Sequence, residues 1–199
     1  MKRVAVLVSG RGSNLAAVIA ARDRGTLPDT ELACVVSNVA DAGALAIAAS
    51  AGISSTVIRH QDFRTRATFD AALVERLHGI DYVLLAGFMR LLSPVMVGAF
   101  KNRILNVHPS LLPAFPGAHA VRDAIAYGAK LTGVSVHFVD EGTDTGPVIL
   151  QRSLAIEDTD TEESLHARIQ KIEHQLVPET LALACAGRLR VDGRRVRVG

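Results

Sequence analysis

A short apolar run that begins at Ile104 carries two side chains that could do chemistry, Asn106 and His108. Positions two apart on a β-strand face the same side, so both side chains should project together from the end of this strand. A histidine acting as a general acid or base near neutral pH contributes ~10² to 10⁴ in rate. An asparagine amide can donate a hydrogen bond to an oxyanion, which is worth ~3 kcal/mol of barrier.

A structural interpretation of the same pair stays open. His108 could simply bond a loop carbonyl and Asn106 could cap a turn, and for an isolated pair this interpretation is favoured. Pro109 and Pro113 follow His108 closely and restrict the backbone there. A stiff loop directly after a histidine favours a functional site.

A third candidate is a carboxylate in the acidic, glycine-containing loop at residues 140–147. If Asp144 reaches His108, it stabilises the charged imidazolium, which can then serve as an acid. Asp140 and Glu141 are equally acidic neighbours, and any of the three could be a solvated loop residue. Spacing alone does not separate them.

The loop at residues 9–14 reads Ser-Gly-Arg-Gly-Ser-Asn and should open a helix. Free N–H groups at a helix N-terminus favour an anion, and glycine lets the backbone approach a phosphate closely. Ser13 and Asn14 add side-chain donors. Leu15 stands where a dinucleotide fingerprint needs its third glycine, and no Gly-Lys-Ser/Thr follows, so neither a dinucleotide site nor a nucleotide P-loop is expected. The loop is either a monophosphate cradle or a tight turn that caps the helix.

Strand and helix patterns alternate along the first half of the chain. β-Branched or apolar runs predict strands at 4–8, 32–36, 55–58 and 82–85, and Ala-rich amphipathic segments predict helices at 14–22, 42–51 and 64–78. This alternation indicates right-handed crossovers and an α/β fold with a doubly wound, mostly parallel sheet, Rossmann-like in its N-terminal half.

The second half changes character after a short strand at 104–107 and a proline-rich turn. A helix is predicted at 121–127, and alternating apolar and polar residues at 134–139 and 148–156 predict an antiparallel hairpin. A long helix is predicted over 161–186, with capping residues Thr161 and Ser164 at its start and a kink or interruption at Pro178. Without a repeat or linker, we predict a single domain over residues 1–199.

The composition argues against several kinds of partner. The formal net charge is only +2, so no nucleic-acid partner is expected. No stretch is long enough to span a bilayer, and the short apolar N-terminus ends in a polar turn instead of a cleavage site. Cys34 and Cys185 have no second cysteine or histidine at metal-ligand spacing, so we expect free thiols and no metal. We expect a cytoplasmic protein without a membrane partner, as a monomer or homodimer. The chain ends in an arginine-rich run that we interpret as a solvated tail: Arg188, Arg190, Arg194, Arg195 and Arg197.

Four motifs together give a specific resemblance. They are Gly-x-Gly-Ser-Asn after the first strand, Ala-Gly-Phe-Met-Arg at 86–90, Leu-Asn-Val-His-Pro-Ser-Leu-Leu-Pro at 105–113, and Asp-x-Gly-Pro-Val-Ile at 144–149. With these motifs the chain resembles the phosphoribosylglycinamide formyltransferase family, from its first strand to the Glu173-His174 pair. The third motif is typical of the wider formyltransferase fold, and the Gly-Ser-Asn loop narrows the resemblance to enzymes that use glycinamide ribonucleotide.

The resemblance implies roles for the matching residues. The catalytic group would be Asn106, His108 and Asp144. The acceptor and its phosphate would be held by Gly12, Ser13, Asn14 and Glu173. The reduced folate would be bound by Arg64, Met89, Arg90, Leu91, Leu92, Asn106, Asp140 and Glu141. Two further positions, His119 and Ser135, would lie near the ligands, and His137 would pack within its strand.

The implied reaction moves the formyl group of the co-substrate 10-formyltetrahydrofolate to the amine of glycinamide ribonucleotide. It would give formylglycinamide ribonucleotide and tetrahydrofolate in de novo purine biosynthesis. An α-amine titrates at about 7.7–8.0, so it must lose a proton to attack. Asn106 and protonated His108 would stabilise the oxyanion, and Asp144 would keep the imidazole charged. No metal and no covalent enzyme intermediate would be needed.

Three alternatives remain at this point. A formyltetrahydrofolate deformylase would use water as acceptor, but usually carries an extra N-terminal domain, whereas this chain begins at its first strand. A methionyl-tRNA formyltransferase carries a C-terminal RNA-binding domain, for which 199 residues leave no room. A folate- or phosphate-binding module would bind without turnover and would not need Asn106, His108 and Asp144 together.

Overall fold

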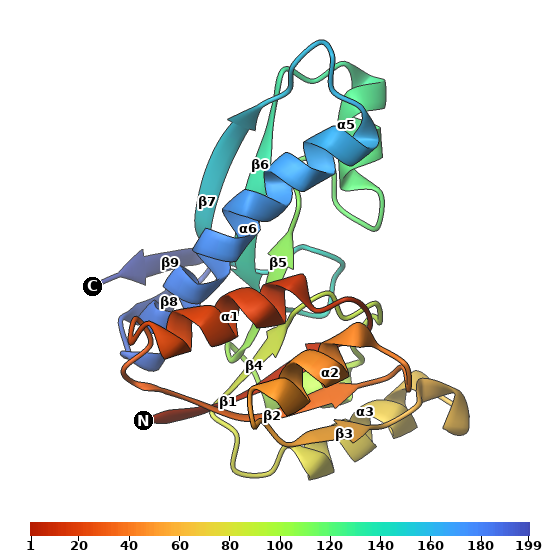
Figure 1. Cartoon of the computed structure of the whole chain (residues 1–199), viewed down its shortest axis with the longest axis vertical. Coiled ribbons are helices and arrows are strands. Elements are labelled where there is room, and N and C mark those ends of the chain that lie inside the picture. Colours follow the sequence, from red (N-terminus) through yellow and green to blue (C-terminus); the bar gives the residue numbers. More distant parts are fainter.

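The computed structural model describes the whole chain, residues 1–199, as a sheet covered by helices (Figure 1). The strands of the main sheet are β1 (Lys2–Val8), β2 (Thr30–Ser37), β3 (Ser55–Val57), β4 (Tyr82–Leu85), β5 (Ile104–His108), β6 (Leu131–Phe138) and β7 (Val148–Ala155). The helices are α1 (Ser13–Asp23), α2 (Gly43–Ser50), the 3₁₀ turn η1 (His60–Asp62), α3 (Arg66–Arg76), α4 (Pro94–Ala99), α5 (Ala120–Tyr127) and α6 (Glu162–Cys185).

The sheet has seven strands in the order β3-β2-β1-β4-β5-β6-β7. The five strands from β3 to β5 are parallel, whereas β6 and β7 run antiparallel to their neighbours. This confirms the doubly wound, mostly parallel sheet with an antiparallel hairpin in the second half. Residues 4–8 of β1 have no exposed surface, because helices cover both faces of a parallel sheet.

Two apolar cores lie on the two faces of the sheet. The larger core includes residues of α1, α2 and α6, and Figure 1 shows α1 and α6 beside each other on this face. The smaller core includes residues of α3 and α4. The helices therefore fix the sheet from both sides and leave its strand ends free to carry a site.

The strand order reverses direction next to β1. The chain proceeds from β1 outward to β2 and β3, and then returns to place β4 on the other side of β1. The carboxyl ends of β1 and β4 consequently diverge into loops at this switch point, which is where ligands bind in open α/β sheets. The two loops touch there, because the Ser9 N–H donates to the Gly87 carbonyl at 3.2 Å.

The structure confirms the predicted start of α6 and corrects two other predictions about helices. Thr161 caps α6 and forms a capping box with Ser164, as the sequence indicates. The interruption expected at Pro178 is wrong, since α6 continues unbroken to Cys185. Pro178 is buried beside Leu176, Val177 and Leu181, and burial of this stretch offsets the missing backbone hydrogen bond. The helix predicted from residue 64 starts later, because Thr65 is its N-cap and forms a capping box with Thr68.

The arginine-rich end is not a tail, and that interpretation is wrong. It forms a second, two-stranded antiparallel sheet from β8 (Leu189–Asp192) and β9 (Arg195–Val198). Leu189, Val191 and Val196 are half-buried against the larger core, which anchors the hairpin, while the arginines stay exposed.

Helix α4 was also not predicted from the sequence. None of the helices combines the length and the apolar character needed to cross a bilayer.

Candidate active site

His108 lies at the end of β5, with only 4% of its surface exposed. Its Nδ1 atom is 3.3 Å from Asp144 Oδ2, and its Nε2 atom is 2.8 Å from the Phe115 carbonyl oxygen. A carbonyl oxygen only accepts hydrogen bonds, so Nε2 donates to Phe115. The Asp144 carboxylate on the other side of the ring is placed where it would stabilise a positive charge on the imidazole.

Of the three acidic residues in the loop, Asp144 is the one whose carboxylate lies next to His108. Its Oδ2 atom also accepts from the Gly117 N–H at 2.8 Å. The pKa of Asp144 lies below its ordinary value because of hydrogen bonding to His137, the Gly117 amide and the charge of His108, while burial acts the other way. Asp140 instead folds the loop by accepting from Thr145 and Gly142, and Glu141 is exposed.

The loop reaches this position because of a glycine. A Cβ atom on Gly146 would lie 1.8 Å from the Phe138 carbonyl oxygen, so no other residue allows this close approach. Asp144 itself adopts a positive φ of 54°, which aspartate tolerates better than most residues. The local backbone thus returns the chain to β7 with the Asp144 carboxylate directed at His108.

Asn106 lies opposite His137 in the antiparallel register of β5 and β6, and Asn106 Nδ2 is 3.2 Å from His137 Nε2. His137 Nδ1 is 2.9 Å from the Phe138 carbonyl oxygen and must carry the proton there. The other ring nitrogen, Nε2, faces the Asn106 amide. His137 Nε2 also lies 3.7 Å from Asp144 Oδ1. The sequence placed His137 only in its strand, and its part in this cluster was missed.

The predicted acceptor residues meet between α1 and α6. Gly12 is the N-cap of α1, with a φ of 84°, and a Cβ atom there would lie 2.7 Å from Ala44 Cβ. Asn14 Nδ2 donates to Glu173 Oε2 at 3.0 Å across 159 positions of sequence, and both residues are buried. Because the Asn14 amide is engaged, the loop offers an anion its backbone N–H groups and the Ser13 hydroxyl.

The predicted folate residues 89–92 lie between β4 and α4, and all of them except the half-buried Leu92 are exposed. Met89 is 74% exposed and Leu91 58%, which is unusual for large apolar side chains side by side and is typical of a binding surface. The Met89 N–H donates to Ser9 Oγ at 2.8 Å, so this stretch is joined to the loop at residues 9–14. Arg64 is exposed ahead of α3.

A family model described as formyl transferase matches residues 2–181 of the chain. The chain belongs to the formyl transferase family. It is 39% identical to the phosphoribosylglycinamide formyltransferase of Bacillus subtilis over 183 residues, 91% of this chain and 93% of that protein. The crystal structure of glycinamide ribonucleotide transformylase 1 from Symbiobacterium toebii is 47% identical, with a TM-score of 0.97 over 100% of this chain and 94% of that one.

Longer relatives contain a matching region as well. The chain is 46% identical over 192 residues to the trifunctional purine biosynthetic protein adenosine-3 of Drosophila pseudoobscura pseudoobscura. It spans only 14% of the length of that relative. The family model ends before the β8–β9 hairpin, which therefore lies outside the matched region.

In this formyl transferase, Ser135 supports the loop after β5. Its hydroxyl donates to the Ser110 carbonyl at 2.7 Å and accepts from the Leu112 N–H at 3.0 Å. Gln151 Nε2 adds a bond to the Leu112 carbonyl at 2.9 Å. The hydroxyl is thus occupied in holding the loop that carries Phe115. His119 is exposed at the N-cap of α5 and makes no capping bond.

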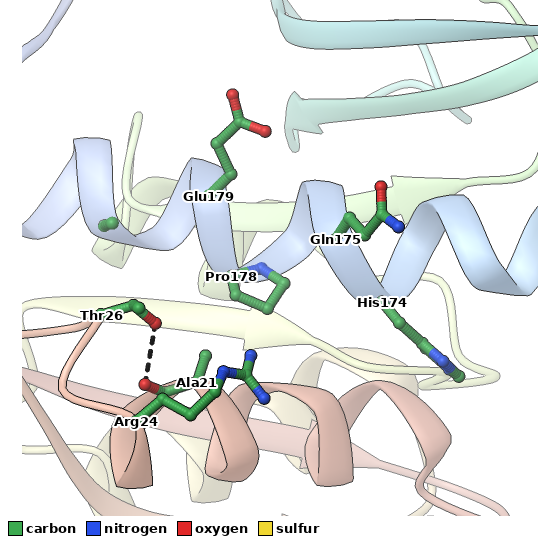
Figure 2. A pocket seen from close by; sticks show the side chains of 8 residues that line it. Ala21, Arg24, Thr26, His174, Gln175, Pro178 and Glu179 are labelled. Atoms are coloured by element: carbon green, nitrogen blue, oxygen red, sulfur yellow. Dashed lines mark hydrogen bonds between the residues drawn. The ribbon is translucent and has the colours of Figure 1, made fainter.

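A separate hollow of about 240 Å³ lies between α1 and α6 (Figure 2). Pro178 faces α1 across it, and Thr26 Oγ1 donates to the Ala21 carbonyl at 2.8 Å at one end. None of the predicted site residues lines this hollow. The small side chains Ala21, Pro178 and Ala182 account for the hollow, because they do not fill the space between the two helices.

The other groups that could do chemistry are sparse in this formyl transferase. No three histidine, cysteine or acidic side chains gather in a way that could hold a metal ion. Cys34 and Cys185 are free and buried, as predicted, and burial raises the pKa of both thiols. A buried thiol with a raised pKa is a poor nucleophile.

Proposed function

We propose that the chain transfers the formyl group of 10-formyltetrahydrofolate to the amine of glycinamide ribonucleotide in purine biosynthesis. The observation that carries the proposal is the position of His108, whose two ring nitrogens face the Asp144 carboxylate and the Phe115 carbonyl at the end of the strand that also carries Asn106. The name of the Bacillus subtilis relative, which matches nearly end to end, supports the same acceptor. The products are formylglycinamide ribonucleotide and tetrahydrofolate.

His108 and Asn106 act on the oxygen of the formyl group. The neutral amine attacks the formyl carbon, and the carbonyl oxygen gains negative charge. The His108 Nε2–H is bonded to the Phe115 carbonyl in this structure, so this donor becomes free when the oxyanion displaces that neutral acceptor. An ionised acceptor makes the stronger bond, which favours the exchange. The second N–H of the Asn106 amide supports the oxyanion.

Asp144 maintains the charge of His108 throughout this step. Its low pKa keeps the carboxylate ionised near neutral pH, so an anion always faces Nδ1. Protons then pass from the attacking nitrogen to the departing folate nitrogen. The tetrahedral intermediate collapses and releases tetrahydrofolate, with the formyl group on the amine.

The two substrates occupy neighbouring segments. The N-terminus of α1, with Gly12, Ser13 and Asn14, holds the phosphate of the ribonucleotide, and Glu173 lies beside it. The reduced folate lies along residues 89–92, with Arg64, Asp140 and Glu141 as outer contacts. The hydrogen bond between Met89 and Ser9 joins the two segments. Holding both substrates in register supplies a large share of the rate in a two-substrate transfer.

Two rival functions are separable by one assay. The absorbance of 10-formyltetrahydrofolate is followed with the enzyme, with and without glycinamide ribonucleotide. Loss of the formyl group that depends on the ribonucleotide supports the proposal. Loss with water alone means a deformylase, and ligand-induced thermal stabilisation without either reaction means a binding module. We also propose a cytoplasmic location and a monomeric or homodimeric state.

A further inference from the structure

Asp70 carries a carboxyl group that is buried where two helices of the smaller core pack against each other. It lies on α3, which packs against α4, and none of its surface is exposed. The smaller core formed where these helices meet includes Phe69 and Leu73 of α3 and Met96 of α4. No lysine, arginine or histidine forms an ion pair with it, so this acidic group is buried without a countercharge.

A single hydrogen bond accounts for the orientation of Asp70. Its Oδ2 atom accepts from the backbone N–H of Ser93, the N-cap of α4, while Oδ1 has no partner. The Ser93 hydroxyl is also buried without a partner. Burying an acidic group with a free oxygen lowers stability compared with an apolar side chain of the same size. The position of Ser93, directly after residues 89–92, supplies a reason for this cost.

The stretch at residues 89–92 is fixed at both of its ends. At the first end, Met89 N–H donates to Ser9 Oγ at 2.8 Å, and the Ser9 hydroxyl donates to Asn38 Oδ1 at 2.6 Å. Asn38 Nδ2 in turn lies 3.1 Å from His60 Nδ1. At the second end, the Ser93 N–H is held by Asp70. Between these two amides, Leu92 packs partly against the smaller core, while Met89, Arg90 and Leu91 are exposed.

We propose that Asp70 is a positioning residue for the folate-binding stretch at 89–92, acting through the backbone of Ser93. The inference rests on the proposed function, which assigns this stretch to the reduced folate. Without the second anchor, the stretch samples more conformations. The affinity for the folate then falls in proportion to the fraction that remains competent to bind. The acceptor site, which lies beyond the first anchor, is unaffected.

The test compares two substitutions of Asp70 with a control on the same helix. Asp70→Leu keeps the approximate volume and removes the acceptor, whereas Asp70→Asn keeps an acceptor oxygen and replaces the carboxyl group with an amide. Glu75→Gln is the control, because Glu75 is exposed on α3 and forms no ion pair. Calorimetry measures the Kd of the dideaza analogue of the folate, steady-state kinetics measure the KM of the ribonucleotide, and hydrogen exchange reports on residues 86–94.

We expect Asp70→Leu to weaken binding of the folate analogue about tenfold and to speed exchange over residues 86–94. We expect a smaller loss of about threefold in Asp70→Asn, because an amide oxygen can still accept from the Ser93 N–H. The KM of the ribonucleotide should stay within about twofold in both variants. If Asp70→Leu does not fold, Asp70→Asn decides the question by the same measurements.

Two results would overturn the positioning role. One is wild-type affinity for the analogue in the substituted proteins, and the other is a parallel change in analogue Kd and ribonucleotide KM, which a general loss of structure would cause. A wild-type protein that does not bind the analogue would instead overturn the proposed function, and this role with it. The two failures are therefore distinguishable.

Discussion

Asn106 on β5 and His137 on β6 face each other directly across the antiparallel pair, with Asn106 Nδ2 3.2 Å from His137 Nε2. His137 Nδ1 donates to the Phe138 carbonyl, which fixes the ring with Nε2 facing the Asn106 amide. This contact decides which way the Asn106 amide points. In the proposed reaction, His137 thus orients the amide that stabilises the oxyanion.

Substitution of His137 should therefore lower turnover more than binding. In His137→Ala, the Asn106 amide loses its only side-chain partner and rotates freely, and we expect kcat to fall about tenfold. Both KM values should change by less than threefold. Steady-state kinetics with each substrate varied in turn check this. The exposed His166 on α6 gives a matched control, and equal kcat in His137→Ala and His166→Ala would exclude the orienting role.

Replacement of His108 should remove the acid itself. In His108→Ala we expect kcat to fall by ~10² to 10⁴, the usual contribution of general acid–base catalysis, while binding of the folate analogue stays near the wild-type value. Single-turnover rates and calorimetry separate the two effects. Unchanged turnover would remove His108 from the mechanism.

The pKa of Asp144 predicts how stability depends on pH. Its folded-state pKa lies below the ordinary value of 3.8, so the ionised carboxylate stabilises the folded protein above that pH. This stabilisation is lost as pH falls through the folded-state pKa. We expect Asp144→Asn to be less stable than wild type at pH 7 and the gap to narrow below pH ~4.

Urea unfolding at both pH values measures the gap. Glu141→Gln is the control, since Glu141 is exposed in the same loop, and its stability should follow the wild type. A gap between Asp144→Asn and wild type that is the same in acid and at neutral pH would show that the carboxylate does not gain its low pKa from folding.

Gly12 should tolerate no side chain. Its φ of 84° is strained for alanine, and the new Cβ atom would lie 2.7 Å from Ala44 Cβ. We expect Gly12→Ala to lower the free energy of unfolding by ~1–3 kcal/mol and to raise the KM of the ribonucleotide. Gly10→Ala is the matched control, because nothing lies within 4 Å of a Cβ atom there. Similar behaviour of the two variants would contradict the account of this loop.

Elements whose pattern is local could be predicted from the sequence. The continuous apolar run in β1 indicated a strand buried on both faces, and Thr161 with Ser164 indicated the start of α6. The placement of Asn106 and His108 in one cluster followed from strand alternation alone. Each of these depends on contacts within a few residues of sequence.

Features that depend on distant partners could not be predicted. His137 joins the cluster only through its register opposite Asn106, although Ser135 and His137 alternate on one face of β6 and could have signalled a polar face. Asp144 is distinguished from Asp140 by the Gly117 amide, 27 positions away. The β8–β9 hairpin is stabilised by half-buried Leu189 and Val191, which pack on the larger core. In the sequence these two residues alternate with arginines, so the segment reads as solvent-exposed.

The most direct measurement follows the formyl group itself. The enzyme is incubated with glycinamide ribonucleotide and 10-formyltetrahydrofolate carrying an isotopic label in the formyl group, and the ribonucleotide is examined by mass spectrometry. The account predicts labelled formylglycinamide ribonucleotide with wild-type protein and a large loss of its rate of formation with His108→Ala. Label released as formate, with the ribonucleotide unmodified, would contradict it.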